Sequence, residues 1–337
     1  MRDKTIGVVL FQLGGPDTPE AIEPFLYNLF SDPDIIDFPL AKVARPVLAK
    51  LISKGRARKV TRHYAQIGGA SPIGKLTGQQ TRALENELRK TIDARVFVAM
   101  RYWHPFTSEA IERVRQAACD ELILLPLYPQ YSSTTTGSSF NEWEKRCREQ
   151  DFELPSTRIR QFFDFEPYLD SLVERINETM SRFDPGETPH LVFSAHSVPT
   201  SVIEAGDPYK RQIEATVKLT VERGGWTNPV TVCFQSKVGN RKWLRPSLHE
   251  TISDLGGKNV KSMLVVPIAF VSDHVETLAE INIEAREEAA EHGIRHFEMM
   301  PGLNDSPVFI QALASLVLLA VQEKPELALA HAASAVS

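Results

Sequence analysis

The sequence predicts an α/β protein built from two similar doubly wound, Rossmann-like domains, each with a parallel sheet of the four-stranded type flanked by helices. Short β-branched runs alternate with longer helical patterns throughout the chain, which is typical of parallel sheets covered on both faces. Both halves also run strand, polar loop and helix in the same order, with Leu-Gly-Gly at residues 13–15 and Ser-Ala-His at residues 194–196 opening the respective halves. The 337 residues, 42% of them hydrophobic, are enough for two cores of ordinary size.

The predicted strands are short apolar runs bounded by polar loops. They are residues 6–13, 95–100, 122–127, 190–194, 230–235 and 260–267. Helical periodicity fills the stretches between them, and we place the division between the halves near Pro155. The expected organisation is an N-terminal domain over 1–155, a C-terminal domain over 156–325 that carries the candidate catalytic residues, and an Ala-rich tail over 326–337.

Composition excludes several classes of protein. A net charge of −5 gives no overall basic footprint, so nucleic acid is not an expected partner. Cys119, Cys147 and Cys233 lie far apart with no C-x-x-C pair, which indicates a reduced cytoplasmic compartment and argues against a structural zinc site. The late apolar segment 308–321 is shorter than the about 20 residues that span a bilayer. We therefore expect a cytoplasmic protein, with peripheral contact at the inner face of the membrane left open.

A row of acidic residues follows the last predicted strand. Asp273, His274 and Glu276 pass from the strand onto the start of a helix, and Glu276, Glu280 and Glu284 recur at a spacing of four. Carboxylates so placed repel one another by roughly 0.2–0.5 kcal/mol per pair, so a cation or shared protons would explain the row. The alternative is a solvated acidic face, because acidic residues continue beyond the row.

Three further segments are candidates for ligand contact. His196 ends an apolar run, where an imidazole can accept a proton or bind a metal near pH 7; a structurally locked histidine is the alternative. The Ser/Thr-rich loop 128–140, which contains Ser132, is either an anion-binding loop or an ordinary capped turn, and it lacks the Walker spacing. The basic stretch 54–59 is either solvated or useful for an anionic substrate.

These segments together resemble the ferrochelatases from about Gly7 to about Leu319. The matching strings are LGGPDTPEAIEPFLYNLFSDPDII, IGGASPI, RYWHP, YPQYSSTTTGSSF, FSAHSVP, GDPY, FQSKVGNRKWL and VPIAFVSDHVETLAEINIE. The resemblance implies insertion of ferrous iron into a porphyrin, usually protoporphyrin IX, with release of two pyrrole protons, at the last step of haem synthesis. Such a reaction needs a sheltered cleft that accepts protons and strips water from the iron.

The resemblance also implies roles for individual residues. His196 stands at the pyrrole centre and Glu276 faces it, both in contact with the metal, and proton acceptance by His196 is favoured over iron ligation. A relay for protons or iron is implied for Asp273, His274, Glu280 and Glu284. Asp273 and His274 are expected to hold Glu276 in place.

Porphyrin contacts are implied at apolar and aromatic positions and at basic or hydroxyl positions near the propionates. These positions are Leu13, Arg56, Lys59, Tyr64, Ser71, Arg101, Tyr102, Ser132, Trp243 and Phe270. Core packing is the alternative for Leu13 and Phe270. No cysteine-rich C-terminal extension is present, so we expect no iron–sulfur cluster, no permanently bound cofactor and a monomer.

Three other functions remain open at this point. A coproporphyrin-type ferrochelatase or a cobalt or nickel chelatase would act on a more carboxylated ring. A non-catalytic porphyrin or haem carrier would need an axial ligand and propionate clamps, but it has no use for Glu276, Glu280 and Glu284 in a row.

Overall fold

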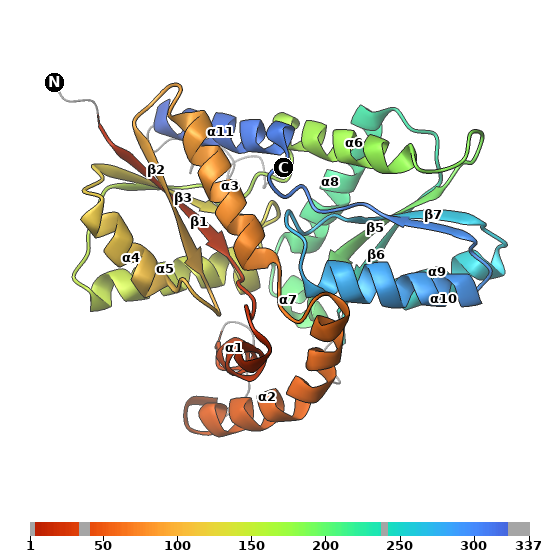
Figure 1. The fold of residues 1–337 in the computed structure, drawn as a ribbon, viewed down its shortest axis with the longest axis horizontal. Coiled ribbons are helices and arrows are strands. Elements are labelled where there is room, and N and C mark those ends of the chain that lie inside the picture. Colours follow the sequence, from red (N-terminus) through yellow and green to blue (C-terminus); the bar gives the residue numbers. More distant parts are fainter. Residues whose placement is uncertain (1–3, 34–40, 237–241, 323–337) are drawn as a thin grey trace.

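Two parallel four-stranded sheets form the centre of the computed structural model, which describes residues 4–33, 41–236 and 242–322 (Figure 1). The first sheet has the order β2 (Ala94–Met100), β1 (Ile6–Gln12), β3 (Glu121–Pro126), β4 (Ser156–Arg158). The second has the order β6 (Val230–Gln235), β5 (His190–His196), β7 (Ser262–Pro267), β8 (His296–Met299). The same topology therefore occurs twice, and the predicted fold class is confirmed. The predicted tail lies outside the described residues.

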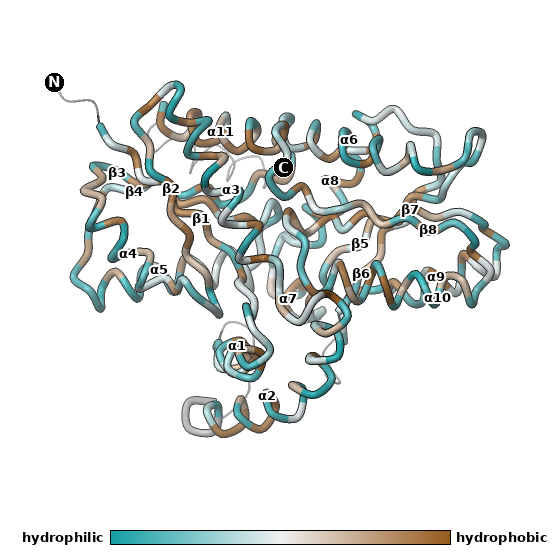
Figure 2. The backbone as a smooth tube through the Cα atoms, in the orientation of Figure 1, coloured by the Kyte–Doolittle hydropathy of each residue, from teal (hydrophilic) through white to brown (hydrophobic). Residues whose placement is uncertain are grey.

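Helices connect the strands, and most of them cover the two sheets (Figure 1). They are the 3₁₀-helix η1 (Pro19–Ala21), the α-helices α1 (Ile22–Phe30), α2 (Ala41–Gln66), α3 (Ile73–Leu88), α4 (Thr107–Gln116), α5 (Ser138–Glu149), α6 (Glu166–Met180), α7 (Thr200–Glu204), α8 (Tyr209–Gly224), α9 (Leu248–Gly257), α10 (Arg286–Glu291) and α11 (Pro307–Gln322), and the π-helices η2 (Ser133–Gly137) and η3 (Glu276–Ala285). Figure 2 shows hydrophobic stretches along the strands of both sheets. Strands β1 and β7 are buried over their whole length, which explains their unbroken apolar sequences.

Two edge strands were missing from the sequence-based prediction. Strand β4 has only three residues, Ser-Thr-Arg, and β8 reads His-Phe-Glu-Met, so neither presents an apolar run. Edge strands need less burial than central ones, which leaves a weaker pattern in the sequence. Strand β4 pairs with β3 and therefore belongs to the first sheet, just beyond the predicted division near Pro155. The division itself stays a prediction.

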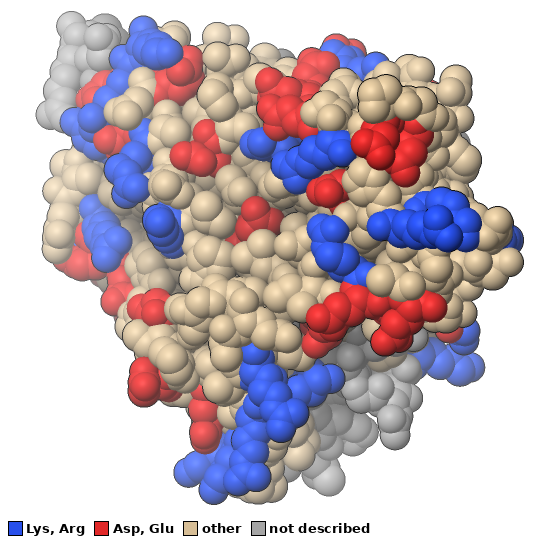
Figure 3. Space-filling model, turned by 45° about the vertical axis from the view of Figure 1, so that its right-hand side comes forward, with Lys and Arg blue, Asp and Glu red and all other residues tan. Residues whose placement is uncertain are grey.

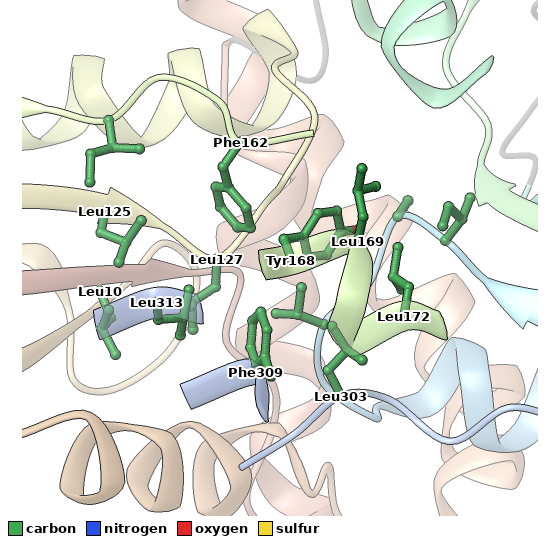
Figure 4. Close-up of a cluster of buried hydrophobic side chains, with 14 of the residues drawn as sticks. Leu10, Leu125, Leu127, Phe162, Tyr168, Leu169, Leu172, Leu303, Phe309 and Leu313 are labelled. Carbon is green, nitrogen blue, oxygen red and sulfur yellow. The ribbon is translucent and has the colours of Figure 1, made fainter. Parts of the chain in front are cut away.

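One hydrophobic core joins the two sheets. Leu10 and Leu125 from the first sheet belong to the same buried cluster as Tyr168 of α6 and Phe309 and Leu313 of α11 (Figure 4). Helix α11 packs against both α3 and α6, so the end of the described chain returns from the second sheet to the first (Figure 1). The carboxyl ends of the strands in the two halves are thereby held in a fixed relation.

Helices α1 and α2 project away from the sheets (Figure 1). Helix α2 is rich in Lys and Arg and contains no Asp or Glu. On its first half, the apolar residues Val47 and Leu51 are each 65% exposed. No helix of the described part of the chain is long and apolar enough to cross a bilayer.

Candidate active site

His196 and Glu276 meet at neighbouring strand ends of the second sheet. Strand β5 ends at His196, β7 pairs with β5, and Glu276 begins η3 in the segment that follows β7. His196 Nδ1 lies 2.8 Å from Glu276 Oε2. Carboxyl ends of adjacent parallel strands are where α/β proteins place ligand-binding groups. The structure thus brings together the two residues expected to flank the metal.

The pair is an ion pair in a largely buried setting. Burial acts to raise the pKa of Glu276, but the charge and hydrogen bond of His196 outweigh it and hold the pKa well below its usual range. Burial likewise acts to lower the pKa of His196, and the charge and hydrogen bond of Glu276 outweigh it and raise the pKa. The His196 side chain remains 37% exposed, against 17% for Glu276. The resting pair therefore holds one proton, on an imidazole that is partly exposed.

Ser236 links Glu276 to the next carboxylate of the row. Its hydroxyl lies 2.9 Å from Glu276 Oε2 and 2.6 Å from Glu280 Oε2. Burial, followed by the negative charge of Glu276, raises the pKa of Glu280 to about 7. Ser236 lies in the FQSKVGNRKWL motif, and its position directly after β6 is the one indication of a role that the sequence offers.

The acidic row follows the π-helix η3. Helices with i→i+5 bonding are rare in proteins, and those that occur are often found at functional sites. Here the helix begins at Glu276. The last carboxylate of the row, Glu284, is 41% exposed, and its Oε1 lies 3.0 Å from His63 Nε2 of α2. The row therefore leads from the buried pair toward the surface, and it ends at a histidine that the sequence did not single out.

Asp273 and His274 have different surroundings. His274 is buried, its Nδ1 lies 3.2 Å from the Ser272 carbonyl oxygen, and its Nε2 lies 4.0 Å from Glu276 Oε2. The Asp273 carboxylate accepts hydrogen bonds from the backbone N–H of Gly302, from Thr277 and from Asn304. His274 thus lies next to Glu276, whereas the bonds of Asp273 hold the surrounding loops.

Apolar groups surround the pair. The ring of Phe270 lies 6.1 Å from the His196 ring and 4.2 Å from the His274 ring, measured between centroids. Tyr64 is buried in a cluster against which Leu13 packs. Burial raises the pKa of Tyr64, and the charge of Glu276 raises it further. Phe270, Tyr64 and Leu13 are therefore placed to form part of an apolar wall.

Four further predicted porphyrin contacts are Arg56, Lys59, Ser71 and Trp243. Arg56 lies over the Phe30 ring at 5.6 Å, and Lys59 is exposed on the same helix. Ser71 donates its backbone N–H to the Pro16 carbonyl, and Trp243 forms a bridge with Pro199, three residues after His196. The indole N–H of Trp243 is buried and has no hydrogen-bond partner within the described ranges.

Arg101, Tyr102 and Ser132 are engaged inside the protein. The Arg101 guanidinium lies 2.8 Å from Asp32, and the Tyr102 hydroxyl donates to the same carboxylate at 2.5 Å. Ser132 is fully buried and donates to Asp207 at 3.1 Å. The Ser/Thr-rich loop thus joins the first half of the molecule to the second. These bonds indicate a structural role for the loop and give no support to anion binding. The partners lie too far away in the sequence for the loop's composition to reveal them.

Tyr209 is a further site residue that the sequence did not identify. It lies at the start of α8, and its hydroxyl donates to the backbone carbonyl of His196 at 2.9 Å. Asp207 accepts the backbone N–H of Tyr209 at 3.0 Å. The GDPY string contains both residues, so this motif helps to fix the position of His196 through its backbone carbonyl.

Comparison with known proteins adds independent findings. The family model described as Ferrochelatase matches residues 5–320. The chain is 44% identical to the ferrochelatase of Gloeothece citriformis over 94% of this chain and 83% of that protein. It is 45% identical to the ferrochelatase of Picosynechococcus, over 95% and 84% of the two chains. Among solved structures, SirB from Bacillus subtilis with Fe3+ has a TM-score of 0.54 at 11% identity, covering 95% of this chain and 96% of that one, which is a likeness of fold.

Proposed function

The chain belongs to the ferrochelatase family, a class of lyases that form metal–nitrogen bonds, and on that premise we propose that His196 and Glu276 are its catalytic centre. Its reaction is the insertion of ferrous iron into protoporphyrin IX, which yields protohaem and two protons at the last step of haem biosynthesis. Porphyrin and iron are therefore its substrates. The observation that carries the assignment of the centre is the His196–Glu276 ion pair, which has a row of carboxylates behind it.

The pair can both receive protons and meet the metal. Nδ1 of His196 is bonded to Glu276, so Nε2 is the ring nitrogen left available to a substrate. An arriving divalent cation disfavours the imidazolium form by charge repulsion, so the Nε2 proton is lost to solvent while Nδ1 keeps its proton in the bond to Glu276. His196 Nε2 can then take a pyrrole proton as the Nδ1 proton passes to Glu276. We propose this order in preference to permanent ligation of iron by His196.

The acidic row provides a route by which the released protons can leave the site. Glu280 and Glu284 follow Glu276 along η3, and exposure rises from 17% at Glu276 to 41% at Glu284. We propose that protons leave along this row, with His274 maintaining the environment of Glu276. Asp273 contributes by holding the loops that carry this site, through its bonds to Gly302, Thr277 and Asn304.

The porphyrin ring would rest against apolar groups and present its propionates to basic ones. Phe270, Tyr64 and Leu13 supply the apolar surface near the pair. Arg56 and Lys59 lie on α2 and carry charge opposite to that of the propionates. We propose these five positions, with Ser71 and Trp243, as the porphyrin site. The alternative of a non-catalytic carrier is disfavoured, because it gives no use to the acidic row.

Anaerobic absorbance tests the proposed centre. Purified protein is mixed with protoporphyrin IX and ferrous iron, and loss of the free-base bands is followed beside His196→Ala. Conversion by the wild type and loss of conversion in His196→Ala, with porphyrin still bound, supports the assignment. Near-normal conversion by the variant contradicts it. Binding without conversion by the wild type would favour a carrier or another tetrapyrrole as substrate.

We also propose peripheral contact with an anionic membrane surface through α2. Basic side chains gather on the projecting part of the molecule, where Figure 1 places α2 (Figure 3). Val47 and Leu51, each 65% exposed, add apolar groups to that helix. Clusters of basic side chains are attracted to anionic bilayers, and exposed apolar side chains beside them can insert at the interface. Co-sedimentation with phosphatidylglycerol vesicles, lost in Val47→Ser/Leu51→Ser and absent with phosphatidylcholine vesicles, would support the contact; equal binding of the double variant would contradict it.

A monomer that lacks an iron–sulfur cluster completes the proposal. Cys119 and Cys233 are buried, and burial raises the pKa of both thiols, which disfavours the thiolate that a cluster requires. Sedimentation velocity of the purified protein gives its oligomeric state, and its visible absorbance before iron addition reveals any cluster.

A further inference from the structure

The Ser236 hydroxyl contacts two carboxylates although it has a single proton to donate. Its Oγ lies 2.9 Å from Glu276 Oε2 and 2.6 Å from Glu280 Oε2. An ionised carboxylate can only accept hydrogen bonds, whereas a protonated one can donate. If both carboxylates were ionised, one contact would bring a lone pair against a lone pair. The three groups therefore fit together when one carboxyl group carries a proton.

Two arrangements satisfy this hydrogen-bond count. In the first, protonated Glu280 donates to Ser236, and Ser236 donates to ionised Glu276. In the second, protonated Glu276 donates to Ser236, and Ser236 donates to ionised Glu280. Moving two protons by one bond each converts the second arrangement into the first, without any movement of a heavy atom.

Resting on the proposed function, we propose that the Ser236 hydroxyl is the proton-transfer group between Glu276 and Glu280 during iron insertion. Glu276 gives its proton to Ser236 Oγ as the Ser236 O–H proton passes to Glu280. Glu276 ends ionised, Glu280 ends protonated and the hydroxyl is regenerated, so atoms and charge balance. The proton on Glu280 then leaves toward Glu284.

Two observations support this direction of transfer. The 2.6 Å contact with Glu280 is the shorter of the two and falls in the range of bonds from an O–H donor to an ionised acceptor, so Glu280 is the carboxylate that receives the Ser236 proton. His196 Nδ1 also bonds Glu276 Oε2, and it favours the ionised form in which Glu276 ends the transfer.

The backbone at Ser236 allows an informative pair of substitutions. Its φ of 66° is in the left-handed region, which glycine adopts without strain. Ser236→Gly removes the hydroxyl and leaves room for a water molecule that can pass a proton. Ser236→Ala removes the hydroxyl and places an apolar methyl group near both carboxylates. The two variants therefore differ in whether a substitute carrier can enter.

Anaerobic single-turnover insertion, measured in H2O and in D2O, tests the proposal. We expect Ser236→Ala to slow insertion about 10-fold or more, as for loss of a group that transfers protons. Ser236→Gly should retain more activity than Ser236→Ala. The solvent isotope effect should increase in Ser236→Ala, because proton transfer becomes limiting. Porphyrin affinity, measured by fluorescence, should be unchanged in both variants.

Asn259 provides a matched control for the backbone. Its φ of 62° is close to that of Ser236, and it lies in the turn after α9. Asn259→Gly and Asn259→Ala should insert iron at the wild-type rate and show whether alanine at such a φ only lowers stability. Wild-type rates in both Ser236 variants, or slowing with an unchanged isotope effect, would overturn the transfer role. Failure of the wild type to convert porphyrin would instead overturn the proposed function.

Discussion

At the scale of single residues, Glu276 and Glu284 differ in their burial and in the number of site residues that they bond. Glu276 is the partner of His196 and of Ser236, whereas Glu284 is 41% exposed and bonds His63. We expect Glu276→Gln to slow insertion about 100-fold or more, since positioned acid–base groups contribute on that order. Glu284→Gln should be milder, because water can replace an exposed carboxylate. Initial rates with ferrous iron give the ranking, and the reverse order would refute the outward direction of the row.

Arg101 was predicted to contact the porphyrin, but its guanidinium is bonded to other groups of the protein. Its guanidinium lies 2.8 Å from the buried carboxylate of Asp32 and donates to Ser138 at 2.8 Å. Removing one partner of such a pair leaves a buried charge uncompensated, which costs about 3–5 kcal/mol. We therefore expect Arg101→Met to lower the free energy of unfolding by about that amount and to leave porphyrin affinity nearly unchanged. Urea unfolding and porphyrin fluorescence measure the two quantities.

The same substitution at Arg56 is the control for Arg101. Arg56 lies on α2 over the Phe30 ring, and within the described part of the chain it forms no ion pair with a carboxylate. Arg56→Met should weaken porphyrin binding with little change in the free energy of unfolding. If Arg101→Met weakened porphyrin binding more than Arg56→Met, the propionate role first expected for Arg101 would be restored.

At the scale of elements, the π-helix η3 carries a carboxyl group whose pKa is raised on folding. Glu280 has a pKa near 4.5 when unfolded and about 7 when folded. Below pH 4.5 both states hold the proton, and between these values the unfolded state releases it first, so stability falls as pH rises toward 7. Glu280→Gln removes this effect and should stabilise the fold at pH 8 by roughly 1–3 kcal/mol more than at pH 5.

Urea unfolding of Glu280→Gln at the two pH values checks this prediction. Glu284→Gln is the control, because its carboxylate is 41% exposed and its contribution to stability should be small at both pH values. An equal gain from Glu280→Gln at both pH values would mean that Glu280 is not protonated in the folded protein near neutral pH.

The elements also show what the sequence could and could not reveal. Strands β1 and β7 were predictable because burial on both faces requires continuous apolar residues. Strands β4 and β8 were not, since edge positions impose little on three or four residues. The spacing of Glu276, Glu280 and Glu284 suits an α-helix as well as the π-helix that is present, so periodicity did not distinguish them.

The same limit applies to the site. His196 and Glu276 were predictable because each follows an apolar strand and matches a motif. Ser236, His63 and Tyr209 act through partners at least 13 residues away, and their roles depend on distances that only the folded chain sets. Local chemistry thus singled out the two residues that we propose as the catalytic centre, while Ser236, His63 and Tyr209 required the structure.

At the scale of the whole molecule, the two sheets are joined by a shared core and by polar bonds next to the site. Gln212 of α8 accepts the backbone N–H of Tyr131 at 2.7 Å. Asp207 accepts the backbone N–H of Ser133 at 2.7 Å and its hydroxyl at 2.8 Å. Asp207 also bonds Tyr209, which in turn bonds the His196 carbonyl. The join between the halves therefore bears directly on the position of His196.

Asp207→Ala tests this connection between the halves and the site. Hydrogen bonds to a charged group contribute about 1.5–3 kcal/mol, so the free energy of unfolding should fall by about that amount. Insertion should slow while porphyrin affinity changes less, because the loss reaches His196 through Tyr209. Asp254→Ala is the control, since its exposed pair with Lys258 should contribute about 0–1 kcal/mol. Urea unfolding and anaerobic insertion rates measure both effects, and equal results for the two variants would show that the bonds of Asp207 neither join the halves nor hold His196 in place.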